Sequence, residues 1–196
     1  MSLRPVLTSA AILGLLIVIA ACVPAASPNG ANIAPSQIES PVGVTLVSAC
    51  TPSGPELCFN ATDDNCNGVI DEGCGLATGP LQFVIAWGDS PANVDLRVTD
   101  PTGAMVDPQR PTQSDGLRLD RDCPRDNCFG QNVENALFEG TEPPRGKYLV
   151  EIILTDAKGA SLPINVRFGA RVGRLTYGAD LTLEKRDDKK AFSFTL

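Results

Sequence analysis

Residues 58–74, CFNATDDNCNGVIDEGC, gather acidic and amide side chains around Gly68 and enclose them between cysteines. Oxygen-bearing side chains stand at alternate positions, at Asp63, Asn65 and Asn67, and Asp71 follows. Carboxylate, amide and backbone carbonyl oxygens are the ligands that calcium takes from proteins. The pattern therefore indicates either a cation site or an acidic turn that disulfides hold without an ion.

Counted from Asp63, the spacing matches the first nine positions of an EF-hand calcium loop, with Gly68 at the sharp turn. The twelfth position is Cys74, where an EF-hand has a bidentate glutamate, so the loop is not an EF-hand. Glu72 lies close enough to take the closing role. The predicted calcium ligands are Asp63, Asn65, Asn67, the carbonyl of Val69, Asp71 and Glu72.

The wider string over residues 56–74 includes Glu56-Leu57-Cys58, Asp63-Asp64-Asn65-Cys66-Asn67-Gly68 and Asp71-Glu72-Gly73-Cys74. It resembles the MopE-type metal-binding repeat of bacterial surface proteins. That resemblance implies a bound metal, and the oxygen-rich ligand set makes the metal calcium. The chain departs from the family at Ala61, where the family has glycine, and at Asn67, where many members have aspartate. A four-cysteine zinc site is disfavoured because an oxidising exterior removes the thiolates that zinc needs.

The N-terminus has the features of a lipoprotein export signal. Arg4 precedes an apolar run that ends in small residues, which is the shape of a signal peptide. Ile19-Ala20-Ala21-Cys22 resembles the bacterial lipobox, which implies cleavage before Cys22 and acylation of that cysteine. Val23 replaces the aspartate that would retain the protein at the inner membrane, so we expect a lipid anchor at the outer membrane or cell surface.

Cysteine parity agrees with lipidation. The chain has seven cysteines, and removal of Cys22 leaves an even set that predicts three disulfides, although such a set allows 15 pairings. We expect one local bridge and two bridges inside residues 50–74. The cysteines concerned are Cys50, Cys58, Cys66, Cys74, Cys123 and Cys128.

Composition divides the chain into a signal peptide at 1–21, a tether rich in Pro, Ser, Ala and Gly at 22–48, a cysteine-rich metal-binding module at 49–75 and a β-sandwich domain at 76–196. Apolar and polar residues alternate within 94–98, 164–168 and 192–196, as in strands with one buried face, and a further strand has Tyr148, Val150, Ile152 and Leu154 on one face. Residues 83–87 are apolar at nearly every position, which predicts a strand buried on both faces. The fold class is all-β, an antiparallel sandwich of about seven to eight strands.

Four strings of the sandwich resemble an uncharacterised family of exported bacterial domains, similar in outline to prepeptidase C-terminal domains. They are Asn93-Val94-Asp95-Leu96-Arg97-Val98 with Asp100-Pro101-Thr102-Gly103, Leu119-Asp120-Arg121-Asp122, Val133-Glu134-Asn135 and Gly146-Lys147-Tyr148-Leu149-Val150. Asn93 and Arg97 replace an aspartate and a histidine of that family. We expect a weaker second calcium site at Asp95, Asp120, Asp122 and Glu134, with loop caps and pairs to arginines as the alternative.

The composition also limits the function. There is no histidine, which removes the usual general base, and the net charge of −7 argues against nucleic-acid binding. We expect a non-enzymatic, calcium-binding surface lipoprotein with a protein or glycan partner. Two rivals stay open: a carbohydrate-binding module, although aromatic residues are few, and a hydrolase that works with two carboxylates.

Overall fold

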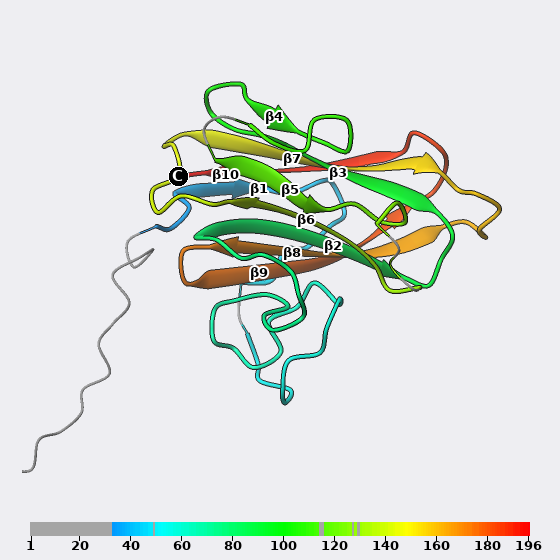
Figure 1. Cartoon of the computed structure of the whole chain (residues 1–196), viewed down its shortest axis with the longest axis horizontal. Helices are drawn as coiled ribbons and strands as arrows, with labels where there is room; N and C mark the ends of the chain where they lie inside the picture. The colour runs from blue at the N-terminus through cyan, green and yellow to red at the C-terminus, as the bar shows by residue number, and fades with distance from the viewer. Residues whose placement is uncertain (1–32, 49, 114–115, 127, 129) are drawn as a thin grey trace, which may run out of the picture.

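The computed structural model describes residues 33–196 except 49, 114–115, 127 and 129, so Cys22 lies outside the described residues. The described chain is all-β and forms two antiparallel five-stranded sheets that pack face to face (Figure 1). This confirms the predicted sandwich. Eight of its strands have five or more residues, and β1 and β4 are short additions that sequence alternation does not reveal.

The first sheet has the order β1–β10–β7–β3–β4, with bounds Gln37–Glu39, Lys189–Thr195, Lys147–Asp156, Asn93–Thr99 and Met105–Val106. The second sheet has the order β5–β6–β2–β8–β9, with bounds Leu117–Arg121, Asn132–Phe138, Leu81–Gly88, Ile164–Val172 and Leu175–Leu183.

The core lies between the two sheets and is supplied by every second residue of the predicted strands. In β3 and β7 the apolar members of the alternation are fully buried: Val94, Leu96, Val98, Tyr148, Val150, Ile152 and Leu154. Aromatic rings of both sheets meet at the centre, where the rings of Phe168 and Phe192 stack with centroids 4.4 Å apart. Contact between aromatic rings across the sheets adds to the hydrophobic stabilisation of the sandwich.

Strand β2 is buried along Leu81–Trp87, as its continuous apolar sequence predicts. Its inner face enters the core, where Phe83 lies 5.4 Å from the ring of Phe194. Its outer face includes Gln82, which is buried and bonds to the carbonyl of Ile70 in the cysteine module, residues 49–75. A sandwich strand is therefore covered on both faces because a separate segment packs on the outside.

Residues 33–48, the described part of the predicted tether, run along one side of the sandwich. Gln37–Glu39 pairs with β10 in the first sheet, and Val47 exchanges two backbone hydrogen bonds of 2.9 Å with Gly178 of the second sheet. The segment thus contacts both sheets before the cysteine module begins. Within the part of the chain that the structure describes, there is no helix with the length and apolar character needed to span a membrane.

Candidate metal-binding sites

Three disulfides form, Cys50–Cys66, Cys58–Cys74 and Cys123–Cys128. The first two interlock within the cysteine module, and each joins residues 16 positions apart. The third closes a loop between β5 and β6. The prediction of two bridges inside the module and one local bridge is confirmed.

The cysteine module packs on the outer face of the second sheet, below β2, β8 and β9 in the view of Figure 1. Ala61 and Ile70 are each only 1% exposed and join the hydrophobic core cluster. The hydroxyl of Thr176 on β9 donates to Asp63 at 3.1 Å. Because the module has few apolar residues, this face of the sheet supplies the core that the module lacks.

Carboxylates hold the first half of the module by accepting backbone hydrogen bonds. Glu56 accepts from the amides of Asp64 (3.1 Å) and Asp71 (2.8 Å). Asp71 in turn accepts from the amides of Asn60 (3.2 Å) and Ala61 (3.1 Å), one with each oxygen. These bonds satisfy amides that no strand or helix could satisfy, since the module has neither.

Asp64 has the same role and accepts from Ser53, the amide of Leu57 and the side chain of Asn60 at 2.8–3.1 Å. The ligand prediction omitted both Asp64 and Glu56. For Glu56, the available signal was an acidic residue two positions before Cys58 in the repeat pattern.

The second half of the module brings four of the predicted calcium ligands together. Oε1 of Glu72 accepts from the amide nitrogens of Asn65 (2.6 Å) and Asn67 (2.5 Å). Oε2 of Glu72 is buried and has no hydrogen-bond partner. Asp63 accepts from the backbone amides of Asn67 (3.1 Å) and Gly68 (2.9 Å), which holds the turn at the glycine.

The two other predicted ligands have different surroundings. Val69 donates its amide to the side-chain oxygen of Asn67 at 2.9 Å. Asp71 is fully buried and directs both oxygens to the first half of the module. The predicted ligand set is therefore divided. One group lies close together and consists of Asp63, Asn65, Asn67 and Glu72. Asp71 instead stabilises the loop that carries this group.

Negative charge accumulates in the module. Burial, together with the charges of Glu72 and Asp64, raises the pKa of Glu56 to about 7. Burial also raises the pKa of Asp71. Arg171 on β8, in the sheet that the module covers, interacts electrostatically with Asp63 and Glu72. Burial is the largest cause of both shifts, and the charges of neighbouring carboxylates add a smaller contribution.

Four residues of the module that are not glycine adopt positive φ, among them Ala61 (55°) and Asp71 (53°). The left-handed region disfavours residues with a Cβ atom. The conformation of Ala61 therefore gives a physical reason for the glycine that the MopE-type pattern has at this place.

In the sandwich, a β-bulge separates the members of the predicted second site. The register between β5 and β6 shifts between Leu119 and Arg121, so Asp120 is an extra residue opposite β6. Asp120 bonds to the amide of Ala77 (2.8 Å) and to Arg118 (2.8 Å) on the outer side of the sheet. An uninterrupted two-residue period would place Asp120 and Asp122 on the same side of the strand, and the bulge prevents this.

The other three carboxylates approach one another near the end of β5. Glu134 is fully buried, and Oε2 accepts from the amide of Leu96 on β3 at 2.6 Å. Burial and the charges of Asp122 and Asp95 raise its pKa well above the usual value. Asp122 pairs with Arg125 at 2.9 Å, whereas Asp95 accepts from Asn93 and Thr155, each at 2.7 Å. Among the described residues, no group of three or more His, Cys, Asp or Glu side chains has the arrangement of a metal site.

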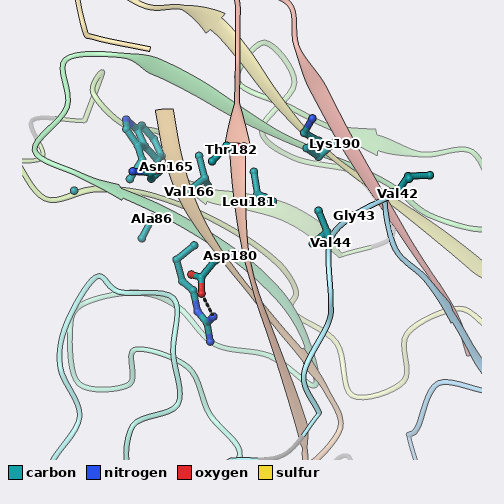
Figure 2. Close-up of a pocket in the computed structure, with 13 residues that line it drawn as sticks. Val42, Gly43, Val44, Ala86, Asn165, Val166, Asp180, Leu181, Thr182 and Lys190 are labelled. Atoms are coloured by element: carbon teal, nitrogen blue, oxygen red, sulfur yellow. Dashed lines mark hydrogen bonds and ion pairs between the residues drawn. The ribbon is translucent and has the colours of Figure 1, made fainter. Parts of the chain in front are cut away.

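Two hollows flank the segment that precedes the module. The larger, of about 650 Å³, lies between Val42–Val44, strands β8 and β9, and Lys190 of β10 (Figure 2). Arg167 and Asp180, which line this hollow, form an ion pair at 3.2 Å. A smaller hollow of about 300 Å³ between the module and β9 shares Arg167. Trp87 lines the larger hollow but is only 5% exposed, so it offers little ring surface to a ligand.

The chain matches no protein-family model, and searches of curated proteins and of solved structures also find no match.

Proposed function

We propose that this chain is a lipid-anchored protein of the bacterial envelope with a non-enzymatic binding or structural role, and that its cysteine module binds calcium. The observation that carries the calcium proposal is the Glu72 carboxylate, which lies against two side-chain amides while its second oxygen is buried without a partner. A buried carboxylate oxygen without a donor is costly, and a cation is one way to compensate it.

The chemistry of the residues fits calcium. The residues that would hold the ion are Asp63, Asn65, Asn67 and Glu72, with the carbonyl of Val69. All of these carry oxygen, the donor that calcium prefers to nitrogen or sulfur. Asn65 and Asn67 would have to turn their side-chain amides to bind the ion, because their oxygens now accept backbone amides and their nitrogens face Glu72. Asp71 would act as a positioning residue, because it fixes the first half of the module through the amides of Asn60 and Ala61.

Lipid anchoring follows from the lipobox and from cysteine parity. The three disulfides use six of the seven cysteines, so Cys22 remains for acylation. A chain exported in this way reaches an oxidising compartment, where such bridges form. The outer membrane or the cell surface is the place where we expect it, with a protein or glycan as its partner.

The absence of histidine from the whole sequence supports a non-enzymatic role. Within the described residues the aromatic rings are buried or partly buried, which weakens the carbohydrate-binding rival because glycan platforms need exposed rings. A glycan array tests that rival, and a panel of glycosidase and peptidase substrates tests the carboxylate hydrolase.

Calorimetry on the purified full chain tests the calcium site. We expect binding with a dissociation constant on the order of 10⁻⁴–10⁻³ M, the range of extracellular calcium modules. Glu72→Gln should remove the part of this heat that the module contributes, because it removes the charge of the closing ligand. Glu142→Gln, which removes an exposed charge in the β6–β7 loop, is the matched control and should bind as the parent does. If the parent and Glu72→Gln release the same heat on addition of calcium, the module binds no calcium and is an acidic turn held by disulfides.

A further inference from the structure

The sandwich contains a buried carboxylate at the corner where β3 of the first sheet meets β5 and β6 of the second. Glu134 projects from β6 between the sheets and is 0% exposed. Its Oε2 accepts the amide of Leu96 at 2.6 Å, which links the two sheets. Its Oε1 is buried and receives no hydrogen bond from any N–H or O–H group of the described residues. A core position with one unsatisfied carboxylate oxygen is unfavourable unless another group compensates it.

The group that faces Glu134 is a second carboxyl, that of Asp122, which is 4% exposed and lies within hydrogen-bonding reach. Two carboxylates can approach in this way only with a proton or a cation between them. Asp95 adds a third negative charge from the facing strand. A single proton would leave two of these three negative charges uncompensated, whereas a divalent cation would leave one.

The positive partner of Asp122 is Arg125, which bonds to it at 2.9 Å. Its side chain is 58% exposed and belongs to the loop that Cys123–Cys128 closes. An exposed arginine holds its partner weakly, because water competes for both groups. Arg125 therefore covers the outer end of the cluster without reaching the unsatisfied oxygen of Glu134 inside.

We propose that Asp122 and Glu134, with Asp95 beside them, form a second cation site that takes a hard divalent ion such as calcium and joins the two sheets at this corner. The carboxylate oxygens supply the ligand type that calcium prefers, and the hydroxyl of Thr155 lies 2.7 Å from Asp95. Because no three acidic side chains of the described residues already have metal-site geometry, binding must draw in Asp95 or water to complete the coordination shell. This site is independent of the cysteine module.

Native mass spectrometry of the purified full chain, first stripped with chelator and then given calcium, counts the bound ions. Glu134→Gln should lose one ion relative to the parent, and Asp122→Asn should do the same. Asp120→Asn is the matched control, because Asp120 is a neighbour in sequence that the bulge turns to the other side of the sheet. It should bind as many ions as the parent does.

Glu134→Gln is informative because glutamine has the same shape, can accept from Leu96 and can donate to Asp122. If Glu134 instead shares a proton with Asp122, the variant mimics the protonated acid, binds as many ions as the parent and melts at the same temperature. That result overturns the proposal.

If Glu134→Gln does not fold, Asp122→Asn at the rim of the cluster tests the proposal by the same count of bound ions. Loss of an ion in Glu72→Gln alone supports only the module site and contradicts this one, whereas loss in Glu134→Gln alone supports this site and contradicts the module site.

Discussion

At the scale of single residues, the cysteine module replaces a hydrophobic core with carboxylates that accept backbone amides. Glu56 and Asp71 each bind two amides, and Asp64 binds one amide and two side chains. Such a segment has too little apolar surface to order its backbone by burial alone. The arrangement brings carboxylates together, and burial, with a smaller contribution from the neighbouring charges, raises the pKa of Glu56.

Calcium-free stability should therefore fall as the pH rises. The pKa of Glu56 is about 7 in the folded chain, against 4.5 as its ordinary value. A raised carboxyl pKa means that the folded state binds the proton more tightly than the unfolded state does. The stabilisation is complete below about pH 4.5 and is lost by the time the pH has passed about 7. Urea unfolding at several pH values, with chelator present, measures it.

Other buried carboxyls, among them Asp71 and Glu134, shift in the same direction, so the parent profile alone does not isolate Glu56. The matched comparison is Glu56→Gln, which cannot titrate at this position. Its profile should be flatter than that of the parent between about pH 4.5 and pH 7. Parallel profiles would contradict a role for Glu56.

Sequence spacing predicted the clustering of Asp63, Asn65 and Asn67, because local alternation around a glycine turn brings nearby residues to one side. It did not predict the separation of Asp120 from Asp122. That separation depends on one extra residue opposite β6, and a bulge leaves no reliable mark in a strand of five residues. The sequence therefore predicted the geometry within one turn, but it did not predict the register between neighbouring strands.

At the scale of elements, the module and the second sheet form one packed unit. Gly169 on β8 faces the module, and a Cβ atom placed there would be 2.3 Å from the carbonyl oxygen of Ala61. Arg121 of β5 lies over the ring of Phe59, 5.5 Å from its centroid. The close approach at Gly169 is to backbone, which cannot move aside as a flexible side chain could.

Gly169→Ala should therefore separate the module from the sheet while the sandwich stays folded. We expect faster proteolytic cleavage within residues 50–75 and a lower melting temperature, with destabilisation on the order of 1–3 kcal/mol, as for other overpacked sites. Leu175→Ala is the control, because that side chain is 44% exposed on the neighbouring strand. Unchanged cleavage in Gly169→Ala would mean that the module does not depend on this contact.

The strand that the sequence predicted best is β3, where apolar and polar residues alternate strictly. Strand β6 is harder to recognise, because Asn132–Phe138 is buried at every position although it includes Glu134 and Asn135. These polar residues are buried because Glu134 bonds to Leu96 across the sheets and Asn135 bonds to Gln82 and Ala77 on the module side. Partners distant in sequence decide their burial, and alternation carries no information about such partners.

At the scale of the whole molecule, the chain enters the sandwich from the N-terminal side and contacts both sheets. Backbone bonds join Ser36 to Thr195 of the first sheet and Val47 to Gly178 of the second. Between Cys22 and Ile33 there are 11 peptide steps. At about 3.5 Å per residue, they span at most about 40 Å. An acylated Cys22 would thus keep the sandwich and both candidate calcium sites close to the membrane surface.

Cys22→Ala should release the protein from membranes, because several acyl chains at Cys22 would supply the binding energy, at about 0.8 kcal/mol per buried CH₂ group. Fractionation of expressing cells should place the parent with the outer membrane and the variant in the soluble fraction. Mass spectrometry of the mature parent should find an acylated cysteine at the N-terminus. The control is Ser27→Ala, in the same segment but outside the lipobox, which should stay with the membrane. Membrane retention of Cys22→Ala, with no acyl mass on the parent, would contradict the anchor and leave the seventh cysteine without a role.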